Sequence, residues 1–274
     1  MRAVPDRQAA SIEFLSRAGR IPLPLPSLQV PPPRQGGDDD VRAATQRPQG
    51  AQAALRHELA QGLMQQQAQI SPKFLYDARG CALFEQITQL REYYPTRTEA
   101  AIMAQHEVDM AQAMSGCQVL IELGAGNCEK VRRLCRRVAP LQFVGVDIAV
   151  EFLQQAVVRL GQDFPQMTAR AVAADFTADW HLPPDVPQGR RELFYPGSSI
   201  GNFDTQQALH MLKHMHSLLN GDGGLLIGID LPKSLPVLIA AYDDEQGVTA
   251  EFNLNVLSHV NRLLGSDFKP QDWE

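Results

Sequence analysis

The sequence predicts an α/β protein, built on a doubly wound parallel sheet with a smaller helical part beside it. Two observations predict this fold class. Short apolar runs alternate with longer segments of helical periodicity between residues 118 and 230. A Gly-x-Gly turn follows the first apolar run, and sheets of this kind bind ligands at the carboxyl ends of their strands. The residues directly after each strand are therefore the candidates for a site.

The expected elements follow from the two periodicities. The strands are expected over residues 118–123, 142–147, 169–175, 192–197 and 224–230. The helices before and between them are expected over residues 53–67, 81–90, 97–114, 128–139, 149–164 and 204–219. In the first helix Leu55, Leu59, Leu63 and Met64 fall on one face. After the fifth strand the pattern predicts a helix, a loop and a further helix, and no more strands.

Composition excludes several classes of protein. The chain has 274 residues, 44% of them hydrophobic, which suffices for one large domain or two modest ones. The net charge is -6 and no Lys/Arg stripe with interleaved aromatics is present, so we expect no nucleic-acid partner. The four cysteines show no C-x-x-C spacing, which favours a reduced, cytoplasmic protein. No apolar run approaches the roughly 18 residues of a membrane span, and no signal sequence is recognised at the N-terminus.

The first 50 residues form a distinct region. The stretch "IPLPLPSLQVPPPRQGGDDD" is rich in proline and ends in glycine and acid, so it cannot contribute a packed core. We expect residues 1–50 to be a disordered N-terminal extension.

The loop after the first strand raises the question of its ligand. Gly124 and Gly126 allow a close approach of backbone to a ligand. Asp147 ends the second strand, 21 positions after Gly126, where an acid can accept hydrogen bonds from ribose hydroxyls. Asp175 and Phe176 end the third strand and suit an adenine amino group and ring. The three positions together indicate a site for an adenosine-containing ligand.

The charges around the loop separate two such ligands. A dinucleotide places its pyrophosphate on a helix N-terminus behind a third glycine, but here Glu129 takes that position and Glu122 precedes the loop. S-adenosylmethionine has no phosphate, and Lys130 could pair with its carboxylate. The loop therefore favours a methyltransferase, with a dehydrogenase as the alternative.

Several longer stretches resemble a known family. The segments "KFLYDARGCALFEQITQLREYYPTRTE", "IELGAGNCEK", "FYPGSSIGNF" and "AYDDEQGVTAEFNLNVLSHVNRLLGSDF" closely resemble the L-histidine Nα-methyltransferases (dimethylhistidine N-methyltransferases) of the ergothioneine pathway. The resemblance covers roughly residues 55–274. It implies a class I S-adenosylmethionine-dependent methyltransferase fold. It also implies three successive methyl transfers to the α-amino group of L-histidine, which give hercynine.

The resemblance implies roles for particular residues. Those expected to bind the methyl donor are Gly124, Lys130, Asp147, Asp175 and Phe176. Those expected to bind the carboxylate and amino group of histidine are Tyr93, Asn202 and Tyr242. Tyr76 and Asn202 are the expected catalytic residues, with a tyrosine or bulk water accepting the amine proton. No metal is expected, although His210 and His214 are four residues apart, because no H-E-x-x-H motif is present.

The resemblance also implies a domain organisation. We expect a substrate domain formed by residues 51–96 and 233–274, and a methyltransferase domain over residues 97–232. The family carries seven strands, and the segment with its last two strands also holds the groups that bind the imidazole; we expect both to be missing here. The first hypothesis is that the chain is an active enzyme, which we expect to be a monomer if it is complete. There are two alternatives. These are a non-catalytic remnant or subunit completed by another chain, and a methyltransferase for another amino acid.

Overall fold

The computed structural model describes residues 49–178 and 180–273, so the expected disorder of residues 1–50 concerns a stretch that lies almost wholly outside the described residues. Within them the chain forms one sheet of five parallel strands in the order β3-β2-β1-β4-β5. The strands are β1 (Val119–Leu123), β2 (Gln142–Asp147), β3 (Thr168–Ala173), β4 (Arg191–Tyr195) and β5 (Gly223–Ile227). The order reverses beside β1, which confirms the doubly wound fold.

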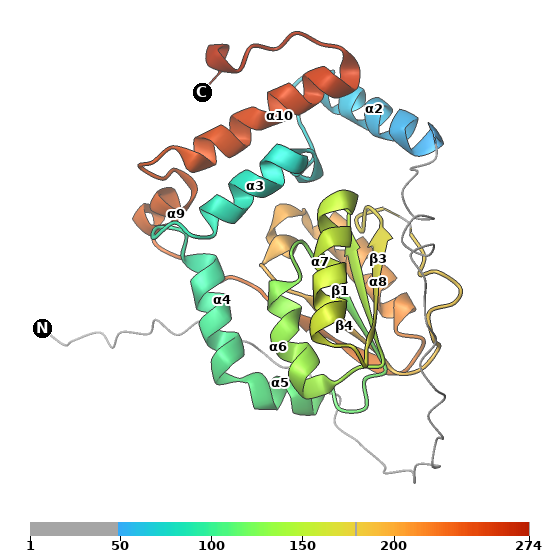
Figure 1. The fold of residues 1–274 in the computed structure, drawn as a ribbon. Helices are drawn as coiled ribbons and strands as arrows, with labels where there is room; N and C mark the ends of the chain where they lie inside the picture. Colours follow the sequence, from blue (N-terminus) through green and yellow to red (C-terminus); the bar gives the residue numbers. More distant parts are fainter. Residues whose placement is uncertain (1–48, 179, 274) are drawn as a thin grey trace, which may run out of the picture.

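The two faces of the sheet carry separate cores. Successive side chains of a strand point to opposite faces. On β1, Leu120 packs in one core with helices α6 (Glu129–Val138) and α7 (Val150–Asp163), whereas Ile121 packs in the other with helix α8 (Thr205–Leu218). All five residues of β1 are buried. Helices cover both faces of the sheet (Figure 1), and β1, β2 and β4 are buried almost throughout, whereas the edge strands β3 and β5 are only partly buried.

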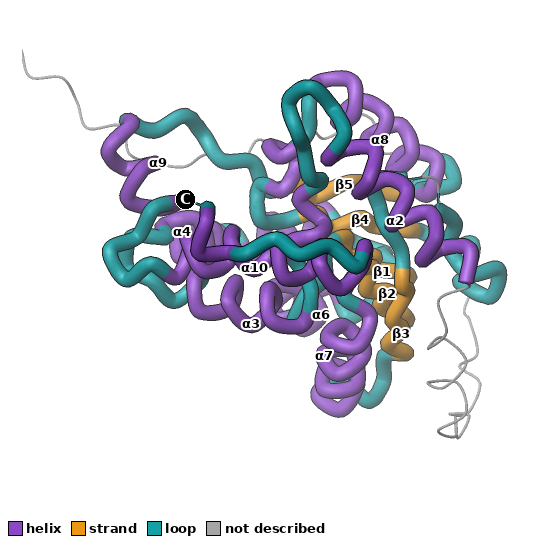
Figure 2. Tube along the Cα trace, turned by 90° about the horizontal axis from the view of Figure 1, so that it is seen from above, coloured by secondary structure: helices purple, strands orange, loops and turns teal. Residues whose placement is uncertain are grey.

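A helical layer covers the carboxyl edge of the sheet. Its elements are α2 (Gln49–Leu63), the 3-10 turn η1 (Pro72–Leu75), α3 (Ala78–Ile87) and α10 (Val248–Leu264). Helix α10 runs across α3 and α2 in both views (Figures 1 and 2). Leu59, Phe74 and Val260 form one small core there, and Phe252 joins a second with Leu83. Segments from before and after the sheet thus pack together. The division of the chain into a substrate domain and a methyltransferase domain stays a prediction.

Some element boundaries differ from those expected. The helix expected over 97–114 is two helices, α4 (Tyr94–Gln105) and α5 (Glu107–Ala113), which meet at His106. The first begins early because Pro95, which has no N–H to satisfy, is favoured in the first turn. Met64 is 81% exposed because α2 ends at Leu63, so its place on the buried face was wrong.

The chain after β5 has the expected order of elements. Helix α9 (Leu235–Tyr242) is followed by a loop and by α10, and the short turns η2 (Ser199–Asn202) and η3 (Pro270–Asp272) were not expected. None of the helices among the described residues has the length and apolar character that a membrane crossing requires.

Asp77 joins helices α3 and α10 of the helical layer. Its Oδ1 accepts the N–H of Gly80 at 2.8 Å, which caps α3, and the Nδ2 of Asn255 at 2.7 Å. Its Oδ2 pairs with Arg262 of α10. The Asp and Gly of the "YDARG" stretch are therefore structural, since a Cβ on Gly80 would lie 1.8 Å from the Leu75 carbonyl oxygen.

The Asp77→Ala change is expected to lower the free energy of unfolding by about 2–3 kcal/mol. The reason is that a helix cap contributes ~1 kcal/mol and each further hydrogen bond a similar amount. Urea unfolding followed by circular dichroism measures the change. Asp77→Asn keeps the Oδ1 acceptor and loses only the charge opposite Arg262. Its unfolding free energy should therefore lie between those of the wild type and Asp77→Ala. Equal stability of Asp77→Ala and the wild type would contradict this role.

Candidate functional site

A cavity of about 440 Å³ lies between the carboxyl edge of the sheet and the helical layer. Its lining includes most of the residues expected from the sequence: Tyr76, Tyr93, Gly124, Lys130, Asp147, Asp175, Phe176 and Asn202. Tyr242 is the expected residue that does not line the cavity. It is 54% exposed, and its ring meets the Tyr93 ring edge-on, with the ring centroids 5.8 Å apart. Parallel strands end at the same edge of the sheet, which is why the expected residues that follow β1, β2, β3 and β4 converge here.

Asp147 fastens the glycine loop to the end of β2. Its Oδ2 accepts the N–H of Gly126 at 2.9 Å, and its Oδ1 accepts the N–H of Ala149 at 2.9 Å. Gly124 and Gly126 have φ angles of 67° and 50°, in the left-handed region that glycine tolerates. Each carboxylate oxygen has a second lone pair, so Asp147 can still accept hydrogen bonds from a ligand's hydroxyl groups.

Asp175 and Phe176 form the wall next to this loop. Asp175 Oδ1 accepts the N–H of Thr177 at 3.0 Å and its hydroxyl at 2.5 Å. Burial raises the pKa of the Asp175 carboxyl, but hydrogen bonds from Lys73 and Thr177 outweigh it and hold the pKa below its usual range. The Phe176 ring lies 3.6 Å from where a Cβ on Gly124 would be, so the aromatic face borders the loop directly.

The Lys130 ammonium already has a protein partner. It pairs with Glu99 Oε2 of α4 at 2.7 Å, and Glu99 Oε1 accepts the N–H of Gly197 at 2.6 Å. Glu99 was not among the expected site residues, although it ends the quoted "YYPTRTE" stretch. A group that binds at Lys130 therefore meets a lysine held in place by a carboxylate, and not an isolated positive charge.

Glu122 is a buried acid that lines the cavity. It is 1% exposed, and its Oε2 has no hydrogen-bond partner among the described residues. Burial raises its pKa well above the ordinary value, and Lys130 opposes that rise while Asp147 adds to it. We therefore expect Glu122 to stay protonated in the folded protein over a pH range where the unfolded chain has lost that proton.

The Glu122→Gln change is expected to stabilise the protein increasingly as pH rises. The unfolded carboxyl ionises near its ordinary pKa of 4.5, whereas the folded one retains its proton to a higher pH. Between the pKa of the unfolded chain and that of the folded protein, the unfolding free energy of the wild type falls by about 1.4 kcal/mol for each unit by which pH rises. Urea unfolding at several pH values measures this slope. Glu151→Gln, at an exposed site on α7, is the control, and an unchanged slope in Glu122→Gln would contradict the assignment.

An aromatic cluster closes the opposite side of the cavity. Tyr76 meets Phe84 and Phe252 edge-on, each with ring centroids 5.5 Å away, and Phe84 meets Tyr93 at 6.3 Å. Burial raises the pKa of Tyr76 to about 12 and that of Tyr93 still further. Both phenols are therefore neutral at physiological pH. They can orient a polar ligand by hydrogen bonds, and their faces can accommodate a cation, but they are not bases there.

Asn202 lines the cavity from the turn after β4. The turn is tight, since Gly197 and Ser198 have φ angles of 82° and 56°. Asp204 caps α8 by accepting the N–H groups of Gln206 and Gln207. Asn202 is exposed and is not needed as the cap.

Further charged residues in the lining were missed from the sequence, among them Asp230 and Lys73. Asp230, after β5, accepts the Tyr94 hydroxyl and the Lys233 ammonium. Lys73, in η1, pairs with Asp175 at 2.5 Å. Asp230 could have been found because it follows the last strand at the carboxyl edge. Lys73 offered no such signal, since it lies 102 positions from its partner.

Fold and cavity together define the class of protein: a doubly wound α/β protein with a glycine loop after β1, acids after β2 and β3, and an aromatic cluster opposite. A family model described as "Histidine-specific methyltransferase, SAM-dependent" matches residues 55–274. The chain belongs to this family of S-adenosylmethionine-dependent methyltransferases.

Curated relatives agree with the family match. The chain is 40% identical over 228 residues to the histidine N-alpha-methyltransferase of Mycolicibacterium smegmatis, covering 82% of this chain and 70% of that protein. It is 38% identical over 220 residues to the Mycobacterium tuberculosis protein of the same name, covering 78% and 67%. It is 31% identical over 212 residues to ergothioneine biosynthesis protein 1 of Neurospora crassa, covering 75% of this chain and 24% of that protein.

Proposed function

We propose that this protein transfers three methyl groups in succession from S-adenosylmethionine to the α-amino group of L-histidine, giving hercynine for ergothioneine biosynthesis. One observation carries the proposal. The same cavity is lined by the glycine loop with Asp147 and Asp175, by Tyr76 and Tyr93 of the helical elements, and by Asn202 after β4. A donor and an acceptor can therefore lie next to each other in it, as methyl transfer requires.

The methyl donor would occupy the side next to the sheet. Asp147 accepts the ribose hydroxyls with the lone pairs that the loop amides leave. Phe176 lies against the adenine ring, and Asp175 accepts its amino group. The methionine carboxylate pairs with Lys130, which Glu99 holds in place. The methionine end of the donor thereby lies next to the Lys130 ammonium and the Glu99 carboxylate.

Histidine would occupy the aromatic side. The neutral phenols of Tyr76 and Tyr93, and the amide of Asn202, orient its amino and carboxylate groups by hydrogen bonds. Tyr242 acts on this site through the Tyr93 ring that it contacts. The aromatic faces accommodate the positive charge of the methylated amine, which no longer has N–H groups to donate after the third transfer.

The chemistry asks mainly for positioning. The lone pair of the neutral amine attacks the methyl carbon as the carbon–sulfur bond breaks, and S-adenosylhomocysteine leaves. A proton must leave the nitrogen before each transfer. Because burial keeps the Tyr76 and Tyr93 phenols protonated, bulk water accepts these protons, and the tyrosines hold the amine in line with the methyl group.

The test is methyl transfer from labelled S-adenosylmethionine to a panel of amino acids. The proposal predicts transfer to L-histidine and to Nα-methylated histidines above all other amino acids. Preferred transfer to another amino acid would support the alternative substrate. Binding of S-adenosylhomocysteine without transfer to any amino acid would support a non-catalytic chain or a subunit that another chain completes.

A further inference from the structure

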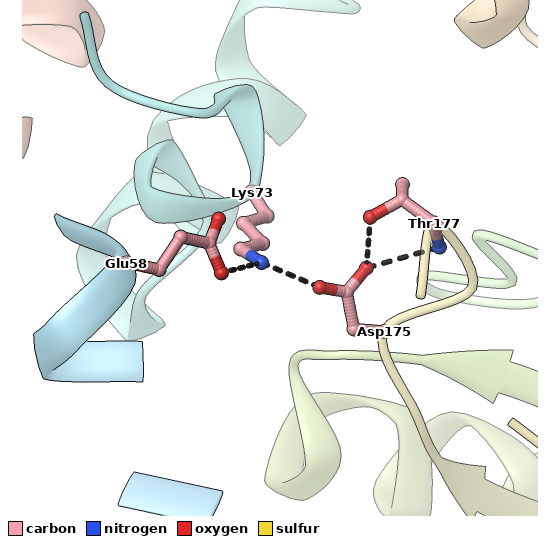
Figure 3. A network of polar contacts seen from close by, with 4 residues as sticks. All are labelled: Glu58, Lys73, Asp175 and Thr177. Carbon is pink, nitrogen blue, oxygen red and sulfur yellow. Dashed lines mark hydrogen bonds and ion pairs between the residues drawn. The ribbon is translucent and has the colours of Figure 1, made fainter. Parts of the chain in front are cut away.

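Lys73 bridges the helical layer and the donor side of the cavity. Its ammonium lies 2.5 Å from Asp175 Oδ2, in the loop after β3, and 2.6 Å from Glu58 Oε2, on α2 (Figure 3). The Lys73 side chain is 11% exposed. It comes from η1, between α2 and α3, so a single side chain links three segments that the sequence keeps far apart.

The burial of this bridge distinguishes it from a surface ion pair. Exposed pairs contribute little, because water screens them. Here the Asp175 side chain is 20% exposed, and its Oδ1 is already held by the amide and hydroxyl of Thr177. Lys73 holds the other oxygen, so both ends of the carboxylate are fixed. Without Lys73, the Asp175 and Glu58 carboxylates would face each other with no cation between them.

The position of Lys73 concerns the adenine end of the donor. Asp175 Oδ2, which Lys73 contacts, is the oxygen not used by Thr177, and therefore the one left to accept an amino group. A carboxylate oxygen has two lone pairs, so Lys73 and an amino group can share it. A carboxylate already oriented loses less freedom when the ligand binds.

We propose that Lys73 is a positioning residue for the methyl donor: it orients the Asp175 carboxylate for the adenine amino group and thereby ties the helical layer to the donor pocket. The inference rests on the proposed function, which assigns Asp175 to the adenine. Lys73 acts on the donor through Asp175. Its ion pair with Glu58, whose side chain is 46% exposed, contributes less to donor binding. Tyr76 caps the same turn, its N–H donating to the Lys73 carbonyl, so the bridge also fixes the start of the aromatic side.

The test is a double-mutant cycle on the full chain, with the Kd of S-adenosylhomocysteine and of adenosine measured by calorimetry. Lys73→Met is expected to weaken both ligands about tenfold, since the hydrogen bond it removes is to a charged group. Asp175→Asn should weaken them similarly. The double variant should be little worse than either single one, because Lys73 acts through Asp175.

Four control variants separate positioning from a purely structural effect. Lys73→Arg should recover most of the affinity, and Glu58→Gln should change it less than threefold. Lys130→Met should weaken S-adenosylhomocysteine but not adenosine, which lacks the carboxylate. Lys213→Met, at an exposed site on α8, should change neither ligand. Melting temperatures identify any variant that has lost its fold, and the Kd of Lys73→Arg then still tests the bridge.

Additive losses from Lys73→Met and Asp175→Asn, or an unchanged Kd in Lys73→Met, would overturn the inference. These outcomes are distinguishable from failure of the proposed function. If the cycle shows coupling but no amino acid is methylated, the proposed function fails and the role of Lys73 in donor binding stands. If histidine is methylated while Lys73→Met binds the donor normally, the proposed function stands and the role of Lys73 in donor binding fails.

Discussion

The Asp147→Ala variant is expected to bind S-adenosylhomocysteine more than about 100-fold more weakly than the wild type. The change removes two hydrogen bonds of 2.9 Å, from the N–H groups of Gly126 and Ala149. Hydrogen bonds to charged groups contribute about 1.5–3 kcal/mol each. It also removes the acceptors that the proposed function assigns to the ribose hydroxyls. The loop would then lose both its anchor to β2 and its contact with the donor.

Calorimetry with S-adenosylhomocysteine measures the Asp147 effect directly. Asp147→Asn keeps one acceptor oxygen and should fall between the wild type and alanine. Asp185→Ala removes an exposed acid that pairs with Arg170, away from the cavity, and should leave the Kd unchanged. A Kd for Asp147→Ala within threefold of the wild type would remove Asp147 from the donor site.

The Asn202→Ala variant is expected to lose on the order of 100-fold in kcat/KM for histidine, while its Kd for S-adenosylhomocysteine stays unchanged. Asn202 lines the cavity, is exposed and does not cap α8, so its removal should not disturb the fold. Its amide can both donate and accept, which suits the amino and carboxylate groups of an amino acid.

The Asn202 effect is measured by steady-state kinetics with histidine and with dimethylhistidine as separate substrates. Asn253→Ala, at an exposed site on α10, is the matched control and should behave as the wild type. Loss of donor binding in Asn202→Ala would mean that the turn after β4 belongs to the donor side. Unchanged kcat/KM would mean that Asn202 does not bind the amino acid.

The sheet could be predicted from the sequence because its signals are local. Strands β1 and β2 are buried on both faces, so they are mostly apolar; the glycine loop follows β1, and Asp147 ends β2. Since parallel strands end at one edge, the donor-side candidates were expected together, and the cavity lining contains them.

The remaining features depend on contacts between distant segments. Lys73 meets Asp175, and Glu99 meets Lys130, only because the helical elements pack over the sheet. No periodicity encodes those pairs. The break at His106 between α4 and α5 was missed because helical periodicity continues across it. Tyr242 was expected in the pocket from the family motif, yet it lies behind Tyr93 and outside the lining.

The most direct test of the proposed reaction is the mass spectrum of L-histidine after incubation with the purified chain and excess S-adenosylmethionine. We expect mono-, di- and then trimethylhistidine, with all three methyl groups on the α-nitrogen and none on the imidazole. A product methylated on the imidazole, or a reaction that stops after one methyl group, would contradict the proposed reaction.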